Sequence, residues 1–133
     1  MLYYTHLIVA LFFALFLFPK FGLVFFIVMM VSSLLPDIDT KYSKFGRRWF
    51  FRPLQFFIRH RGILHSFVFL IIVSLVLFLL SREIAYGFFL GYGLHLFLDK
   101  IGIKAGSPLE TLVFVVFLVG NLGLIFWKVL LLF

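Results

Sequence analysis

The sequence predicts an all-α membrane protein, a polytopic helical bundle of about five transmembrane helices. Of the 133 residues, 65% are hydrophobic and only 13% are charged, which is too little polar surface for a water-soluble domain of this length. The apolar residues fall in blocks bounded by proline, glycine or charge, a pattern typical of spans joined by short connections. Residues 1–133 are therefore predicted to form a single integral membrane domain.

The first two apolar blocks, Leu2–Phe18 and Phe21–Leu35, are predicted to form a helical hairpin. One unbroken helix over both blocks would be about 50 Å long, whereas the hydrocarbon core of a bilayer is about 30 Å thick. Pro19, Lys20 and Gly22 lie where the turn is expected, and a lysine beside a proline suits a membrane surface better than its interior. Because no basic residue precedes the first block and no small-residue cleavage site follows it, we expect a retained span.

Three further apolar blocks, Ile63–Leu80, Ile84–Leu98 and Thr111–Phe133, complete the predicted helices. A helix rises 1.5 Å per residue, so the first and last of these three are long enough to cross the bilayer. The middle one is short, as is the second block of the hairpin, and both are expected to tilt little or to dip into the membrane.

Positive charge is concentrated in one predicted loop, residues 37–62. The formal net charge is +7, and seven of the twelve Lys and Arg residues lie between Lys41 and Arg61. Basic loops stay in the cytoplasm and lie near anionic headgroups, so topology explains the charge and no nucleic-acid partner is expected. With this loop inside, Lys20 and Arg82 lie outside and Lys100 lies inside. The predicted location is the inner (plasma) membrane, crossed several times.

Although this topology rests on lysine and arginine alone, it places all the histidines and aspartates at the same membrane face. All of them come out at the cytoplasmic ends of the predicted helices: His6, Asp37, Asp39, His60, His65, His95 and Asp99. The chain has no cysteine, so a metal there must be bound through imidazole and carboxylate groups. Such ligands suit zinc, with manganese or iron as alternatives. We therefore predict a divalent-metal site at the cytoplasmic face.

The fourth predicted helix carries the clearest pattern. Gly87, Gly91, His95 and Asp99 recur every four residues and share one face. The glycines let a neighbouring helix approach closely, and the same stripe then presents an imidazole and a carboxylate. A polar contact between two helices would also explain this stripe.

Structural explanations stay open for the other candidates. Asp37 and Asp39 follow a helix and also suit solvated loop or capping residues, and His6 also suits an interfacial histidine. His60 and His65 are five residues apart with a glycine between them, so we expect the first in the loop and the second in the opening turn of the third helix.

Three motifs carry a resemblance to a known family. Ser33–Asp39 (Ser-Leu-Leu-Pro-Asp-Ile-Asp), His60–Ser66 and Gly91–Asp99, in this order, resemble the YdjM-like (DUF457) family over residues 6 to about 108. Members of that family are described as inner-membrane, predicted metal-dependent hydrolases, and some as binding a DNA-damage repressor. The resemblance implies a membrane enzyme with a metal held by these motifs.

The order of ligand types is also similar to that of the zinc-dependent phospholipase C and P1 nuclease group. That resemblance implies a main site made of Asp37 or Asp39, His60 or His65, and the His95–Asp99 pair. Asp99 would bridge to a second metal that His6 also contacts.

These ligands predict a hydrolase. A metal with an open position lowers the pKa of bound water to about 7, and a site at headgroup level favours a phosphoester of a lipid or lipid-linked substrate. Asp39 is expected to orient the water if Asp37 is a ligand, and Arg61 to neutralise a phosphate oxygen. Membrane lipids are the expected surroundings. The alternatives are a non-enzymatic protein with a structural His/Asp or metal cluster, and a regulatory protein that binds an acidic partner through the basic loop.

Overall fold

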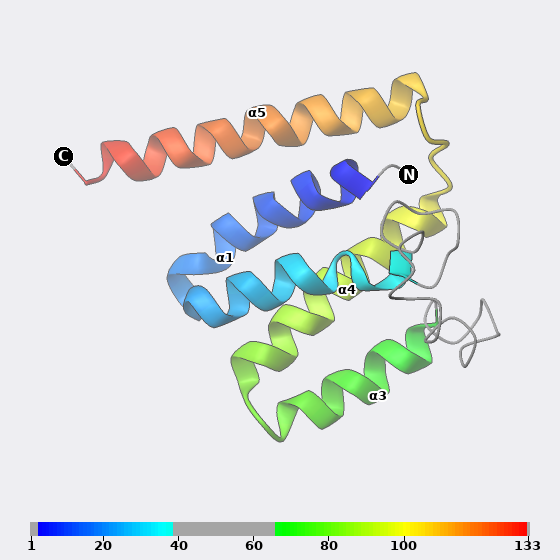
Figure 1. The fold of residues 1–133 in the computed structure, drawn as a ribbon. Coiled ribbons are helices and arrows are strands. Elements are labelled where there is room, and N and C mark those ends of the chain that lie inside the picture. Colours follow the sequence, from blue (N-terminus) through cyan, green and yellow to red (C-terminus); the bar gives the residue numbers. More distant parts are fainter. Residues whose placement is uncertain (1–2, 39–65, 133) are drawn as a thin grey trace.

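The structure is a computed structural model that describes residues 3–38 and 66–132 (Figure 1). This part of the chain is helical and contains no strand, so the all-α prediction is confirmed. Its elements, in chain order, are α1 (Tyr3–Ser32), η1 (Leu35–Ile38), α3 (Phe67–Phe78), α4 (Arg82–Ile101) and α5 (Pro108–Leu130).

Helix α1 is a hairpin of two antiparallel halves, as predicted. Gly22 has φ 78° and ψ −170°, a conformation open in practice to glycine alone, and the ribbon reverses direction there (Figure 1). Ala14 in the first half packs in one core cluster with Phe25 and Met29 in the second half. In a straight helix Ala14 and Met29 would be about 22 Å apart. The turn at Gly22 therefore brings the second half back along the first.

Helices α3 and α4 form a second antiparallel pair. The Ser66 hydroxyl caps α3 by accepting a hydrogen bond from the Phe69 amide at 3.0 Å, and Gly102, with φ 72°, ends α4. The two helices pack through one buried cluster, which consists of Leu70, Phe88, Tyr92 and Leu96.

The glycine stripe of α4 lies against the second half of α1. A Cβ atom added to Gly91 would lie 2.2 Å from both the Met29 carbonyl oxygen and the Ser32 Oγ. The Ser32 hydroxyl donates across the interface to the Gly87 carbonyl at 3.2 Å. The two backbones thus approach as closely as the glycine spacing predicts.

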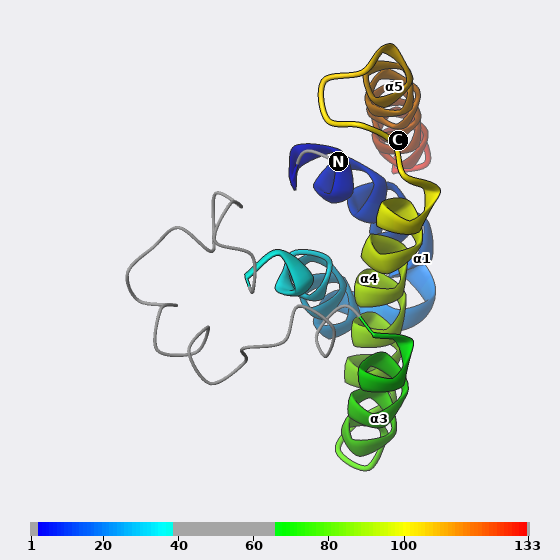
Figure 2. The same cartoon turned by 90° about the vertical axis from the view of Figure 1, so that its right-hand side faces the viewer.

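Helix α5 lies along the first half of α1 (Figures 1 and 2). The Asn121 amide donates to the Ile8 carbonyl at 3.0 Å, and Lys128 Nζ donates to the Leu15 carbonyl. These partly buried polar contacts fix the position of α5 along α1, because apolar contacts alone would let one helix slide along the other.

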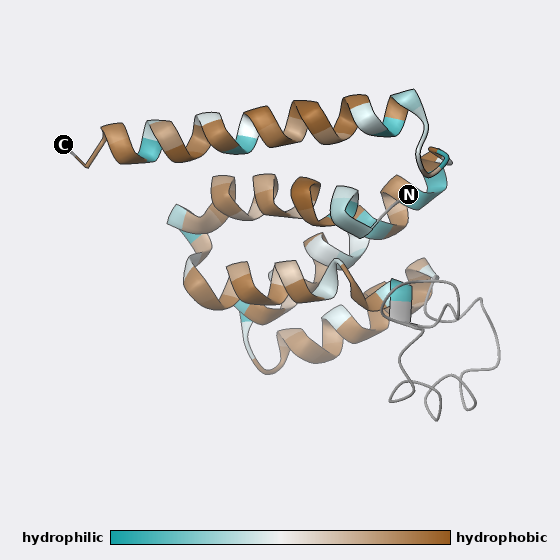
Figure 3. Ribbon diagram, turned by 45° about the horizontal axis from the view of Figure 1, so that its top comes forward, coloured by the Kyte–Doolittle hydropathy of each residue, from teal (hydrophilic) through white to brown (hydrophobic). Residues whose placement is uncertain are grey.

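Two stretches in the described part of the chain are long and apolar enough to cross a membrane: Tyr3–Asp37, which includes the turn at Gly22, and Pro108–Leu130. The prediction of about five transmembrane helices is therefore not supported. Helix α3 has only 12 residues, or about 18 Å, because it begins at the Ser66 cap and ends at Phe78, inside the predicted Ile63–Leu80. Helix α4 carries charged residues in its first and last turns. Most of the α1 and α5 ribbon is brown in Figure 3, the colour of hydrophobic residues.

Candidate metal centre

Four of the predicted ligands lie within the described residues, and the structure places them side by side. His6 comes from the start of α1, Asp37 from η1, and His95 and Asp99 from the last turns of α4. The ligand atoms of His6, His95 and Asp99 all lie within 4.8 Å of one another. The other candidates, Asp39, His60, His65 and Arg61, lie outside the described residues, as does nearly all of the basic loop.

Asp99 contacts both histidines through different oxygens. His6 Nε2 lies 3.2 Å from its Oδ1, and His95 Nε2 lies 3.2 Å from its Oδ2. The two imidazole rings are stacked, with their centroids 4.0 Å apart and their planes at 17°. One carboxylate thus faces two parallel imidazoles, which lie on helices remote from each other in the sequence.

The orientation of His95 is set by the backbone of the α1 hairpin. Its side chain is fully buried, and Nδ1 lies 2.7 Å from the Ser33 carbonyl oxygen. Because a carbonyl can only accept, Nδ1 carries the proton and Nε2 is the atom that faces the carboxylates. This is the tautomer in which metal-ligating histidines are held by a second hydrogen bond.

Asp37 is the more distant of the two carboxylates. Its Oδ1 lies 3.8 Å from His95 Nε2, and its side chain is 19% exposed. Asp99 is 32% exposed, so the cluster is buried on its histidine side and open on its aspartate side. A ligand from solvent or from the membrane surface would reach it past the two aspartates.

The donor set fits a divalent metal. Tetrahedral zinc holds nitrogen and oxygen at about 2.0–2.2 Å, which puts neighbouring ligand atoms about 3.3 Å apart, close to the two measured separations of 3.2 Å. An Nε2 atom without a proton and a carboxylate oxygen are both acceptors, so their close approach suits a cation bound between them. In addition, His6 Nδ1 is buried without a hydrogen-bond partner among the described residues.

Comparison with known protein families matches nearly the whole chain to a family model. A family model described as "YdjM inner membrane protein" covers residues 1–132. The chain belongs to the YdjM inner membrane protein family. This confirms the family resemblance found in the sequence and, together with the apolar helices, shows that the chain is an inner-membrane protein. No curated protein and no solved structure matches significantly. The similarity to phospholipase C and P1 nuclease is not shown and stays a prediction.

In this YdjM-family chain a buried carboxylate that the sequence reasoning missed lies next to the cluster. Glu110 is 2% exposed and accepts a hydrogen bond at 3.0 Å from Thr5, the neighbour of His6. The available signal was the pattern Ser107-x-x-Glu110 at the start of an apolar helix, because a glutamate at this position belongs to a capping box. The Ser107 hydroxyl does accept from the Glu110 amide, at 3.2 Å.

The opposite end of the bundle carries basic side chains that lie near aromatic rings. Lys20 Nζ lies 5.2 Å from the Phe21 ring centroid, and the Arg82 guanidinium lies 6.0 Å from that of Phe78. The pKa of the exposed Glu83 is lowered, chiefly because the Ser81 hydroxyl donates to its carboxylate at 2.5 Å. The described histidines and aspartates all lie at the other end.

Proposed function

We propose that this YdjM-family protein is a membrane-bound, metal-dependent hydrolase that cleaves a phosphoester of a lipid or lipid-linked substrate at the cytoplasmic face. The observation that carries the proposal is the convergence of His6, His95 and Asp99 within 4.8 Å, with His95 held by the Ser33 carbonyl so that Nε2 faces the carboxylates. Two buried imidazoles around one carboxylate form a ligand set suited to zinc, with manganese or iron as alternatives.

Each residue of the cluster has a chemical task in this proposal. A bound divalent metal supplies a Lewis acid for a phosphoryl oxygen and water with a pKa near 7. His6, His95 and Asp99 would hold it, and the Ser33 carbonyl would keep His95 in the binding tautomer. Asp37, partly exposed at the open side, would orient the attacking water and accept its proton.

Two further tasks fall on residues outside the described part of the chain. Asp39 shares with Asp37 the role of ligand or water-orienting carboxylate. Arg61 would neutralise a phosphate oxygen of the substrate through its guanidinium. His60 and His65 would supply additional metal ligands.

The proposed cytoplasmic orientation of the site is supported by the positions at which the basic loop joins the helices. Its first residues adjoin Asp37, which contacts His95, and the chain re-enters the bundle at Phe67, whose ring lies 5.8 Å from Lys100 Nζ. Both attachments are at the cluster's end, and seven of the twelve basic residues lie between them. By the positive-inside rule, this charge distribution supports a cytoplasmic position for this end of a multi-pass protein.

The first test is to count bound transition metal by elemental mass spectrometry on protein purified in detergent without chelator. We expect about one or two equivalents, as a site of this ligand number holds, and loss of the metal in a His95→Ala, Asp99→Ala double variant that stays folded. Phosphoester substrates are then screened with both proteins. A folded wild type that takes up no zinc or manganese would overturn the proposal.

A structural role for the cluster is the second candidate. The His–Asp separations of 3.2 Å are also ordinary hydrogen-bond lengths, and they would tie the start of α1 to the end of α4. In that case the double variant would lose thermal stability, while the wild type would bind no metal and turn over no phosphoester.

A further inference from the structure

The first turn of α1 is held between two other helices. Thr5 and His6 are neighbours in the sequence and are 0% and 2% exposed, yet they contact different partners. The Thr5 hydroxyl donates to Glu110 of α5 at 3.0 Å. His6 Nε2 lies 3.2 Å from Asp99 Oδ1, which belongs to α4. A contact made by Thr5 therefore acts on the same turn of backbone that carries the His6 imidazole.

His6 differs from the other histidine of the cluster in how its ring is held. His95 Nδ1 donates to the Ser33 carbonyl at 2.7 Å, so a second hydrogen bond orients that imidazole. His6 Nδ1 is buried and has no hydrogen-bond partner among the described residues. The start of a helix is also its least restrained part, because the first four N–H groups have no intrahelical acceptor. The position of His6 therefore depends on contacts that hold the whole first turn of α1.

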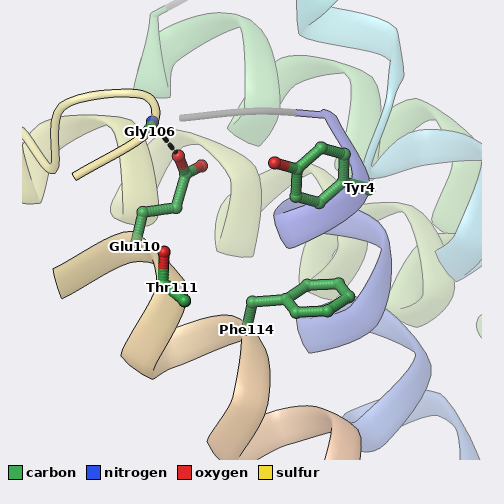
Figure 4. A pocket seen from close by; sticks show the side chains of 5 residues that line it. All are labelled: Tyr4, Gly106, Glu110, Thr111 and Phe114. Carbon is green, nitrogen blue, oxygen red and sulfur yellow. Dashed lines mark hydrogen bonds between the residues drawn. The ribbon is translucent and has the colours of Figure 1, made fainter. Parts of the chain in front are cut away.

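The Glu110 carboxylate provides such a contact from α5. Its Oε2 accepts from the Gly106 amide at 2.6 Å, just before α5 (Figure 4). This bond is local, like the one that a glutamate makes in a capping box. Its Oε1 accepts from Thr5, 105 residues away in the sequence. The second bond has no part in capping α5, and it ties the start of α5 to the start of α1.

Packing between the two helices is incomplete at this point. A pocket of about 290 Å³ lies beside Glu110 and is also lined by Tyr4 and Phe114 (Figure 4). These two rings are in edge-to-face contact, with their centroids 5.3 Å apart. Side chains that line a void lose contacts on that side, whereas a hydrogen bond to a carboxylate is strong and directional. The Thr5–Glu110 bond thus supplies a restraint that the packing lacks.

We propose that Glu110 is a positioning residue of the His/Asp cluster, which acts through the Thr5 hydroxyl to hold His6 against Asp99. Its consequence for metal binding rests on the proposed function, whereas the placement of His6 can be measured in protein without metal. When the bond is lost, the first turn of α1 is free to move, and a metal in the cluster loses one of its two imidazole ligands.

The first test follows His6 in metal-free protein in detergent. Diethyl pyrocarbonate modifies accessible, unprotonated imidazoles, and peptide mass spectrometry locates the modified histidine. Thr5→Val keeps the shape of the side chain and removes the hydroxyl. We expect it to speed the modification of His6 about tenfold, since one hydrogen bond to a charged group contributes about that factor. Thr5→Ser, which keeps the hydroxyl, should keep the slow rate, and His95 is the internal reference.

Two variants of α5 separate positioning from the stability of that helix. Glu110→Gln has one acceptor oxygen in place of two and should speed the modification of His6. Ser107→Ala is the matched control: it removes the cap, a hydroxyl that accepts from the Glu110 amide at 3.2 Å, and keeps the carboxylate. It should lower thermal stability and leave the His6 rate unchanged. A raised rate in Ser107→Ala would assign the effect to α5 stability and overturn the proposal.

The second test measures the affinity for Co²⁺, using the visible absorption of the bound ion, which changes with ligand number and geometry. Thr5→Val should lower this affinity about tenfold, as the loss of a supporting hydrogen bond does. In a His6→Ala background the same change should have no further effect, because the two residues act through one ligand. Equal losses in both backgrounds would show a general structural role and overturn the proposal.

The outcomes distinguish this inference from the metal site itself. An unchanged His6 modification rate in Thr5→Val overturns the positioning role, whatever metal the wild type binds. A wild type that binds no Co²⁺, together with a raised rate in Thr5→Val, overturns the metal site and supports the positioning of His6. Should Thr5→Val fail to fold, Glu110→Gln takes its place under the same criteria.

Discussion

The imidazole of His95 makes four contacts that together define its chemistry. Nδ1 is bound to the Ser33 carbonyl at 2.7 Å, Nε2 faces Asp99 at 3.2 Å and Asp37 at 3.8 Å, and the ring is stacked on His6. With Nδ1 committed to the backbone, only Nε2 can bind a metal or a substrate. The two aspartates therefore differ in importance, because only Asp99 also contacts the second histidine.

The difference between the aspartates gives a prediction at the residue scale. Asp99→Asn removes the charge that both histidines face, and we expect metal affinity to fall at least about 100-fold, the upper range for loss of a supporting carboxylate. Asp37→Asn should lower the affinity less, because Asp37 is the more distant carboxylate. Metal titration in detergent, followed by calorimetry, measures both values. An equal loss in the two variants would contradict this ranking of the carboxylates.

At the scale of the elements, the site depends on how closely α4 packs against the second half of α1. The close approach at Gly91 aligns the last turns of α4 with the Ser33 carbonyl, which emerges at the end of α1. Gly93, two residues further along, faces α3 instead, and a Cβ atom there would lie 3.5 Å from Leu70 Cδ2, an ordinary contact.

The two glycines make a matched pair of variants. Gly91→Ala places a Cβ atom 2.2 Å from the Met29 carbonyl oxygen, so the helices must separate, and we expect a loss of about 1–3 kcal/mol together with weaker metal binding. Gly93→Ala should be neutral or stabilising by up to about 1 kcal/mol, because alanine favours the helix. Thermal unfolding in detergent and metal titration report the two effects. Normal metal binding by Gly91→Ala would show that the site does not depend on this close approach.

At the scale of the whole molecule, the two ends of the bundle differ in the charged and titratable residues that they carry. One end gathers the described histidines and aspartates, the buried Glu110 and the attachment points of the basic loop. The other end has the α1 turn, with Lys20, and the start of α4, with Arg82. This asymmetry is the expected signature of a protein with one fixed orientation in the membrane.

Because the chain has no cysteine, single introduced cysteines can report this orientation. We expect a membrane-impermeant thiol reagent to label Lys20→Cys in intact cells and Lys104→Cys only after the membrane is permeabilised. The unmodified chain serves as the control for background labelling. Labelling of Lys104→Cys in intact cells would reverse the proposed topology.

Much of the architecture could be predicted from local features of the chain. The hairpin was predicted from an excess of apolar length around Pro19, Lys20 and Gly22, and the structure has the turn at Gly22. The predicted number of spans is not supported by the described residues, because an apolar block does not reveal where a helix is capped. The Ser66 cap and the end of α3 at Phe78 leave too short a helix for the predicted span.

By itself, the sequence determined the membrane class, the all-helical fold and the set of side chains available for a metal. These follow from hydropathy, helix length and charge, which are properties of short segments. Only the tertiary structure decided which atoms face one another. The Ser33 carbonyl meets an imidazole 62 residues away, and Thr5 meets Glu110 across 105 residues. Such pairings depend on how helices far apart in the sequence pack together. The pattern of any single segment carries no information about that packing.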